Sequence, residues 1–451
     1  MSARSRRAAL AGLALGLATA SSATARADDV AKKPIVDYDG RGGQSTTAQD
    51  VALFVPRAVF FVPWVVSEYG LRRPLEWLTK KAEKEKWASA IVDLFSFGDE
   101  KNIHIFPTFL LDFGLLPSAG LYVSWNKFLH PDSDLRLHAA TWGPRWLTFT
   151  AAERIRLDGD RTRLTLRGEF TKRQDNQFYG LGPDAPTSNR SRYGKQLAEA
   201  SVAFEQNASN GSFVHTSLAF RDVRFYDGTC CGEPSVPYEA AVSLYPLPPG
   251  FDAGYTVVAP RISFALETRK PRPAPGSGFR AEGFVEPGFT TDGSRRSWVR
   301  YGGDVGVAAD LTGTQRVLSL TLSGRFAGPI GPGGGAVPFT ELVRLGGDDL
   351  MVGFLPGRLA DRSGTALTAL YRWPVWAFLD GTLHVAAGNV FGPMLEGLEA
   401  RKMRLSFGMG IKAGTARDHA FEVLIAAGTE TFEQGGRITS GRLVFGTRRG
   451  F

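Results

Sequence analysis

Long segments with a two-residue hydrophobic period constrain the fold of this chain most strongly. In RLTLRGEFT (residues 163–171), Leu164, Leu166 and Phe170 alternate with charged and hydroxyl-bearing side chains. Because successive side chains of a strand point to opposite faces, such a segment has one apolar face and one polar face. The alternating segments run about 11 to 14 residues, longer than the usual strand of a soluble protein and long enough to cross a bilayer at a tilt.

The number and connections of these segments predict a barrel. They occupy sixteen ranges: 102–113, 116–126, 132–142, 145–157, 161–175, 194–207, 211–225, 254–270, 278–291, 296–311, 314–327, 364–376, 380–391, 401–414, 418–430 and 439–451. An even number is typical of bacterial single-chain barrels, and the long connections 176–193, 226–253 and 328–363 all fall at one end. We therefore predict an all-β transmembrane barrel of 16 antiparallel strands over residues 101–451, rather than a soluble sandwich.

The N-terminal residues indicate export. A basic start precedes the apolar run Ala8–Ala20, which is too short to span a bilayer, and Ala25–Ala27 offers a cleavage site. Residues 1–27 thus read as a signal peptide, and residues 28–50 as a flexible polar leader. Residues 51–100 read as short helices, either in the periplasm or plugging the barrel. A signal peptide followed by a barrel predicts that the protein resides in the outer membrane of a Gram-negative cell after the signal peptide is cleaved.

Composition and motif searches exclude several classes of function. The net charge of +8, part of which lies in the signal peptide, is too small to argue for nucleic-acid binding. The only cysteines, Cys230 and Cys231, are adjacent and read as a vicinal bridge or two free thiols. No metal-binding, phosphate-binding or nucleophile motif occurs, so we predict no cofactor, no metal and no enzymatic activity. An outer-membrane lipase built from a His–Ser pair on the wall stays open as a minor alternative.

One connection has an unusual composition for a loop. The stretch LGGDDLMVGFLPGR (residues 345–358) places large apolar residues among glycines. The residues that we single out as a sixth-loop motif are Gly346, Gly347, Met351, Val352, Gly353, Phe354, Arg358 and Asp361. The strand that follows carries an aromatic run with arginine and proline: Tyr371, Arg372, Trp373 and Pro374.

These motifs resemble the BamA/TamA family of outer-membrane proteins, in a branch without POTRA domains. The terminal Phe451 is the barrel-end signal expected of an outer-membrane barrel's last strand. The resemblance to the family extends to FYGLGPD (178–184) and HVAAGNVF (384–391). It implies a sixteen-stranded barrel whose sixth loop folds back into the lumen. Residues 28–100 are long enough for at most one POTRA domain and lack its strands.

The motif also departs from the family pattern. Val352 stands where the family has an arginine, and Leu370 and Ala386 stand where it has acidic partners. Losing one partner of a buried pair is costly, whereas losing all of them together can be nearly neutral. We therefore expect the loop to insert through packing of Met351, Val352 and Phe354 rather than through an ion pair, with Arg358 and Asp361 as a different polar anchor.

The resemblance implies a role in outer-membrane biogenesis. Protein or lipid would be inserted through a lateral seam between the first and last strands, about 102–113 and 439–451. The expected partners are outer-membrane lipids and, as candidates, unfolded outer-membrane proteins or periplasmic factors; nucleic acid is not expected. The alternative is a plugged channel or lipid-handling barrel without insertase activity, and the sequence leaves open whether residues 51–100 plug the lumen.

Overall fold

The computed structural model describes residues 94–449 with short gaps. The gaps are 99, 160, 209–210, 270–275, 332–334, 349, 377–378 and 414–418, and four earlier residues are also described: Phe61, Val65, Tyr69 and Arg73. All of these belong to one compact unit, Val55–Phe451. The predicted signal peptide 1–27, the leader 28–50, most of the helical segment 51–100 and the terminal Phe451 lie outside the described residues.

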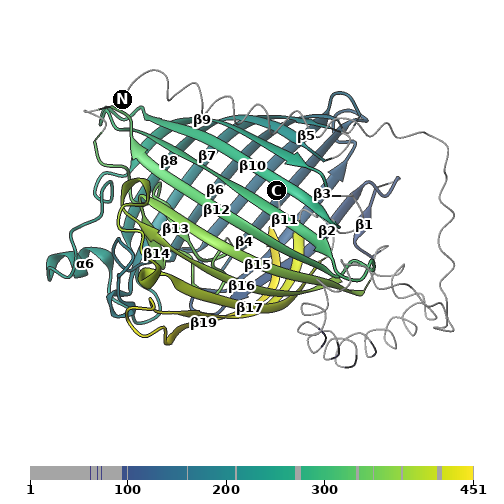
Figure 1. Cartoon of the computed structure of the whole chain (residues 1–451). Helices are drawn as coiled ribbons and strands as arrows, with labels where there is room; N and C mark the ends of the chain where they lie inside the picture. The colour runs from purple at the N-terminus through teal and green to yellow at the C-terminus, as the bar shows by residue number, and fades with distance from the viewer. Residues whose placement is uncertain are drawn as a thin grey trace, which may run out of the picture. The chain divides into compact units, whose positions relative to one another are not determined.

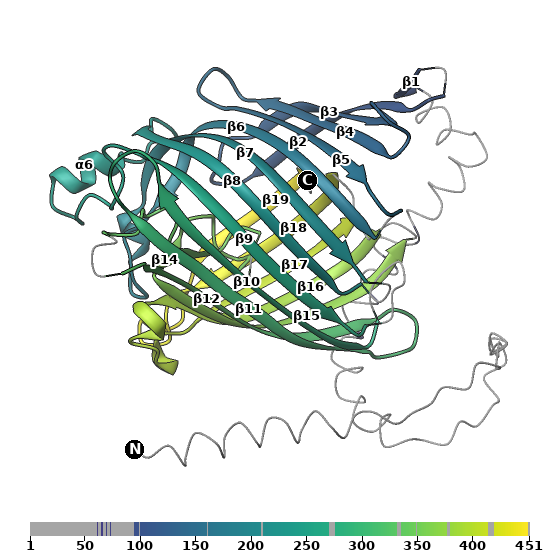
Figure 2. The same cartoon turned by 90° about the horizontal axis from the view of Figure 1, so that it is seen from above.

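Sixteen antiparallel strands form a closed barrel, as the sequence predicts (Figure 1 and Figure 2). In chain order they are β2 (Ile103–Asp112), β3 (Ser118–Asn126), β4 (Ser133–Thr141), β5 (Leu147–Arg156), β6 (Thr162–Phe178), β7 (Ser191–Asn207), β8 (Phe213–Asp227), β9 (Tyr255–Glu267), β10 (Gly278–Thr290), β11 (Ser297–Asp310), β12 (Val317–Pro329), β15 (Ser363–Trp376), β16 (Leu379–Phe391), β17 (Arg404–Ala413), β18 (His419–Thr429) and β19 (Ile438–Arg449). Each strand pairs with its neighbours in sequence, and β19 pairs with β2 to close the ring.

The alternation along each strand places apolar side chains on the outer surface of the barrel and the intervening side chains on the lumen side. On β8, the side chains of Val214, Leu218 and Phe220 are exposed on the outer surface, whereas those of Ala219 and Val223 are buried toward the lumen. Exposed large apolar side chains occur on the outside of every wall strand except β4, and such an exterior suits hydrocarbon and not water. Within the described residues, no helix combines the length and the apolar character that a membrane crossing by a helix requires.

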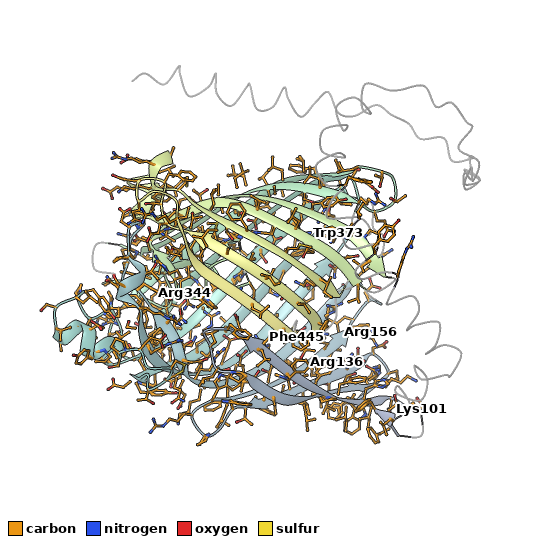
Figure 3. The ribbon with its side chains drawn as sticks, turned by 90° about the horizontal axis from the view of Figure 1, so that it is seen from below. Lys101, Arg136, Arg156, Arg344, Trp373 and Phe445 are labelled. Atoms are coloured by element: carbon orange, nitrogen blue, oxygen red, sulfur yellow. A yellow bond between two sulfur atoms is a disulfide. The ribbon has the colours of Figure 1, made fainter. Side chains whose placement is uncertain are left out.

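The two ends of the barrel differ. The turn end carries short connections such as 127–132, 157–161 and 311–316. The loop end carries the long connections 179–190, 228–254 and 330–362, with the short helix α6 (Val236–Ala241) at the left of Figure 1. Figure 3 places Arg344 toward the loop end and Lys101, Arg136 and Arg156 toward the turn end. The loop 228–254 also contains a disulfide between Cys230 and Cys231.

Two sequence predictions need correction. Ser96–Phe97 form a short strand, β1, that pairs with His104 and Ile103 of β2, so the last part of the segment 51–100 is not helical. The backbone of β2 offers unpaired groups at the turn end, and a short extended segment satisfies them. Strands β6 and β7 also extend farther toward the loop end than predicted, because their pairing resumes at Asn176↔Tyr193 after a register shift.

A hydrophobic cluster lies at the loop end, against strands β6 to β11. Inward-facing wall residues such as Tyr193, Tyr255 and Trp298 pack with Phe251 and Phe339 from two long loops. The rings of Tyr193 and Phe339 lie 5.1 Å apart, edge to face. Burial of several aromatic side chains at this level anchors the loops 228–254 and 330–362 onto the wall.

Candidate functional site: the inward loop and the barrel seam

The connection 330–362, which we call the inward loop, enters the lumen. It contains two three-residue strands, β13 (Val343–Leu345) and β14 (Leu359–Asp361), which pair with each other and bring the two ends of the tip 346–358 together. Figure 1 shows β13 and β14 at the loop end of the barrel. Met351 and Phe354, within the tip, have no exposed surface. A loop with fully buried apolar side chains is part of the core, which explains its composition.

The tip packs against two parts of the wall. Met351 and Phe354 belong to a cluster that contains the inward-facing Ala366 of β15 and Ala386 of β16. Ala386 is one of the positions where the family pattern has an acid, so an apolar contact takes its place. Val352 lies in a separate cluster with Leu424, Ala426, Val444 and Leu110, which come from β18, β19 and β2.

Three glycines allow the close path of the tip. Gly346 and Gly347 have φ values of +109° and +75°, in the region that side chains rarely adopt. A Cβ on Gly353 would lie 2.0 Å from the carbonyl oxygen of Ala427, so the tip backbone runs directly against β18. The Gly353 amide donates to Ser406 Oγ at 2.8 Å, and Ser440 Oγ donates to the Gly353 carbonyl at 2.8 Å.

An arginine of the last strand holds both the loop and the ring. Arg442 on β19 forms a bidentate pair with Asp112 on β2, with Nε–Oδ1 at 2.9 Å and Nη2–Oδ2 at 2.6 Å. The same guanidinium reaches Asp348 Oδ1 at 3.0 Å and donates to the carbonyl oxygens of Gly347 and Val352. We call this group of five residues the seam lock. It supplies the ion pair that the sequence interpretation did not expect, with the cation on the wall and the acceptors on the loop and on β2.

The burial of each side chain indicates how much its contact in the seam lock contributes to stability. The side chain of Arg442 has no exposed surface and that of Asp112 is 7% exposed, whereas that of Asp348 is 60% exposed. Exposed ion pairs contribute little, but removing one partner of a buried bidentate pair leaves an uncompensated charge. The Arg442–Asp112 pair is therefore the strong element, and Asp348 adds orientation.

The seam itself has few backbone contacts. Strands β19 and β2 share three residue pairs: Val444↔Asp112, Phe445↔Leu111 and Gly446↔Leu110. Beyond them, the Phe113 amide donates to the Leu443 carbonyl at 3.0 Å, and Thr447 Oγ1 donates to the carbonyl oxygen of Phe109 at 3.2 Å. The outward rings of Phe109 and Phe445 lie 5.3 Å apart. Phe445 is labelled on β19 in Figure 3. Side chains thus replace much of the missing ladder.

The other predicted polar residues of the loop lie elsewhere. The Arg358 guanidinium stacks over the Tyr179 ring at 4.8 Å and reaches Thr187 Oγ1 at 3.4 Å, so it anchors the loop to the connection 179–190. Burial lowers the pKa of Arg358 and raises that of Asp361, whose Oδ1 accepts from the Arg362 amide. Arg358 and Asp361 do not contact the seam lock.

The structure brings together the other segments on which the resemblance rests. Gly182 in FYGLGPD donates its amide to the Ala360 carbonyl of β14 at 3.1 Å. Asn389 in HVAAGNVF and Arg404 both donate to the Pro183 carbonyl, at 3.1 and 2.9 Å. These contacts dock the connection 179–190 beside the base of the inward loop.

The aromatic run on β15 is not part of the clusters that hold the loop tip. The tip reaches its level through Leu350, whose backbone bonds to His384, the partner of Leu370. Tyr371 and Trp373 are buried and stacked at 5.2 Å, Arg372 Nε lies 3.8 Å from Asp380 Oδ2, and Pro374 precedes a register shift. Tyr371 is five residues beyond Ala366, or about 16 Å along the strand. Phe451 is not described. The structure therefore does not assign these residues to the seam.

A second charged contact fixes the first half of the loop. Glu341 is buried, accepts from the Tyr255 hydroxyl at 2.6 Å, and lies 3.3 Å from Arg300. Burial alone would raise its pKa, but the guanidinium groups of Arg300 and Arg221 hold the pKa of Glu341 below its usual value. The loop thus has a charged anchor at each end of its path through the lumen.

Among the described residues, hydroxyl–imidazole contacts come nearest to a catalytic arrangement, and Thr108 Oγ1 lies 3.1 Å from His138 Nε2. Ser96 Oγ lies 2.9 Å from His104 Nδ1 at the turn end, and no carboxylate contacts His104 among the residues described. The described residues also contain no group of three or more side chains suited to holding a metal ion.

An antiparallel sixteen-stranded barrel with an inward loop and a short seam is the class of fold that these features define. The solved structure of BamA from Haemophilus ducreyi lacking POTRA domains 1-3 is similar, with a TM-score of 0.51 and 14% identity, covering 77% of this chain and 70% of that one. CdiB from Acinetobacter baumannii gives a TM-score of 0.47 and 11% identity over 77% of this chain and 59% of that one. No family model and no curated protein matches the chain. At 14% identity, the likeness to BamA establishes the barrel fold alone.

Proposed function

We propose that this protein is an integral outer-membrane barrel that acts in membrane biogenesis by opening the seam between β2 and β19. The observation that carries the proposal is the three-pair seam, closed by a side-chain lock rather than by a long ladder. An edge strand with unpaired backbone groups is a template for another strand. An open seam would offer such an edge to an unfolded outer-membrane protein, or a break in the wall to a lipid. No catalytic step is needed for either role.

A reversible staple across the seam tests this proposal. In a Cys230→Ser/Cys231→Ser background, Leu111→Cys with Phe445→Cys places two thiols at a paired seam position. The matched control is Ile425→Cys with Leu443→Cys, at a paired position between β18 and β19. The measurement is the outer-membrane protein and lipid composition of the native host when each variant replaces the wild type.

The seam staple is expected to reproduce the effect of depleting the protein, and reduction is expected to reverse it. The control staple is expected to leave the composition unchanged. Normal composition with the seam fully cross-linked would rule out seam opening as the mechanism.

The loop residues inside the barrel favour a second candidate, a plugged channel. Loop residues pack on the β6–β11 side of the loop end, and the tip of the inward loop bonds to β17 and β19. Conductance in planar bilayers would compare the whole chain with a variant lacking residues 28–100. A low conductance that rises on deletion supports a channel plugged by that segment, whereas an unchanged closed state in both proteins favours the seam mechanism.

A further inference from the structure

Two segments of the chain share the edge that β2 presents to the seam. The other edge of β2 is taken by β3, which pairs with residues 103–110. On the seam edge, β19 pairs over 110–112, and β1 pairs over 103–104, nearer the turn end. Figure 2 shows β1 at the end of the barrel opposite α6. Both segments run antiparallel to β2, so β1 follows β19 along one edge and in the same direction.

A proline divides this edge into two parts. The backbone groups of successive residues in a strand face opposite edges, so every second amide of β2 faces the seam. The Ile105 amide donates to the Phe95 carbonyl at 3.0 Å. At the other end of the edge, the Phe113 amide donates to the Leu443 carbonyl at 3.0 Å. Pro107 faces the same edge and has no amide hydrogen, so it interrupts the ladder between the part held by β19 and the part held by β1.

Few contacts hold β1 in place. It pairs with β2 through Ser96↔His104 and Phe97↔Ile103, and Ser96 Oγ lies 2.9 Å from His104 Nδ1. The connection to β2 turns at Gly98, whose φ of +86° favours glycine. The Phe97 side chain is 47% exposed. An edge segment with two residue pairs and an exposed ring can detach locally without unfolding the barrel.

The two segments compete for the same positions. Seven positions beyond Val444↔Asp112, the register of β19 would bring position 451 opposite Ile105. The Phe95 carbonyl already accepts from the amide of Ile105. One edge position cannot pair with two strands at once. A longer seam, or a strand from another polypeptide along the whole edge, therefore requires β1 to leave.

We propose that β1 is a built-in edge strand that regulates the seam. With β1 docked, the backbone groups at the turn end of β2 are satisfied, and this part of the edge is closed to other strands. With β1 released, the edge accepts an extended polypeptide segment as an added strand. This inference rests on the proposed function of the seam, and it adds the step that must precede strand pairing.

Peptide binding to the purified whole protein in dodecyl maltoside tests whether β1 occupies a strand-binding edge. The probe is a fluorescein-labelled copy of residues 91–98, IVDLFSFG, with two added lysines for solubility, because the register of β1, continued, would cover β2 as far as Phe109. Phe97→Pro removes an amide that faces β2, two residues after Phe95. Phe97→Thr is the matched control, since it keeps this amide and loses only the ring.

A staple supplies the opposite change. Ser96→Cys with His104→Cys, in the Cys230→Ser/Cys231→Ser background, places two thiols at a paired position of β1 and β2. We call the oxidised form the β1 staple. It holds β1 on the edge, and reduction releases it.

Removal of β1 should tighten peptide binding, measured by fluorescence anisotropy against empty micelles. Phe97→Pro is expected to bind the probe about tenfold more tightly than the wild type, as for a site that β1 fills about nine-tenths of the time. Phe97→Thr should match the wild type, and the β1 staple should abolish binding until it is reduced. Equal affinity of Phe97→Pro and wild type, or binding to the oxidised β1 staple, overturns the proposal.

The native host separates this proposal from the proposed function. The oxidised β1 staple is expected to change the outer-membrane composition as the seam staple does, and reduction is expected to reverse the change. A silent β1 staple beside an effective seam staple overturns regulation by β1 and leaves the seam mechanism standing. If both staples are silent, the seam mechanism fails and the regulatory role of β1 fails with it.

Discussion

The pairing of β6 with β7 and the pairing of β19 with β2 show two ways of joining neighbouring strands. The first uses fifteen residue pairs, interrupted by one register shift. The second uses three. Where the backbone ladder is long, the side chains only need to fit, because main-chain hydrogen bonds hold the strands. Where it is short, specific side chains must join them.

The comparison shows where the barrel can be altered by a single residue. In a ladder of many equivalent hydrogen bonds, the loss of any one of them has little effect on strand pairing. The seam instead depends on one buried guanidinium, that of Arg442, which also holds the inward loop. Seam closure and loop insertion are therefore linked by a shared side chain, and four changes test this difference between the two joints.

Loss of the guanidinium should have the largest effect. Arg442→Met leaves Asp112 buried without its cation and should destabilise the barrel by about 3–5 kcal/mol. The measurement is the urea midpoint of the folded form, followed on unheated gels. Arg437→Met, at an exposed residue of the connection 430–437, is the control and should be silent.

A double variant separates charge from packing. Replacing both Arg442 and Asp112 by Met should recover part of the lost stability, because no uncompensated buried charge remains. If Arg442→Met alone is as stable as the wild type, the three backbone pairs suffice and the comparison fails.

Removal of the main apolar contact of the tip should come next. Phe354 is fully buried, and a Cβ on Gly428 would lie 2.6 Å from its ring. Phe354→Ala should therefore cost about 3 kcal/mol by the same measurement, since a cavity remains. Phe432→Ala, at a side chain that is 46% exposed, should cost little. Equal effects of the two changes would mean that the tip does not contribute to the core.

A methyl group at the seam should have an intermediate effect. Gly446 has a φ of +143°, and a Cβ there would lie 2.2 Å from the Phe109 carbonyl oxygen. Gly446→Ala should thus cost about 2 kcal/mol and speed amide exchange in β2 and β19, because the strands must separate. Gly168→Ala is the control on β6, where a Cβ would meet nothing within 4 Å. Equal exchange in both variants would show that the seam is no weaker than β6.

The smallest effect should come from acid. Because the pKa of Glu341 is depressed in the folded protein, its contribution is present above the unfolded value of about 4.3 and is lost as pH falls below it. The thermal midpoint of the wild type should drop more between pH 6 and pH 3.5 than that of Glu341→Gln. Parallel curves would mean that the Glu341 contact adds no pH-dependent stability.

The sequence predicts the wall better than the site, for a physical reason. Strand β12 can be predicted from the local alternation of Leu318, Leu320 and Leu322 alone, without reference to distant residues. Arg442 also sits in an alternating strand, where it looks like any lumen-facing charge. Its partner Asp112 is 330 residues away in sequence, and only closure of the ring brings them together.

The resemblance helped with the loop and misled about its anchor. It directed attention to Met351 and Phe354, which the structure places in the core. It also directed attention to the missing arginine at Val352, and so to packing as the replacement. The cation is instead supplied by the wall at Arg442, and no local pattern near Val352 indicates it.

The position of Arg442 bears on the order of folding. Asp112 lies in the first wall strand, the inward loop lies between the eleventh and twelfth, and Arg442 lies in the last. We expect their common contact to form last, after every strand is in place and the loop is inside. A polypeptide that fails to enclose its own loop would then lack acceptors for this guanidinium, and such an incompletely assembled molecule would stay open and recognisable to quality-control proteases.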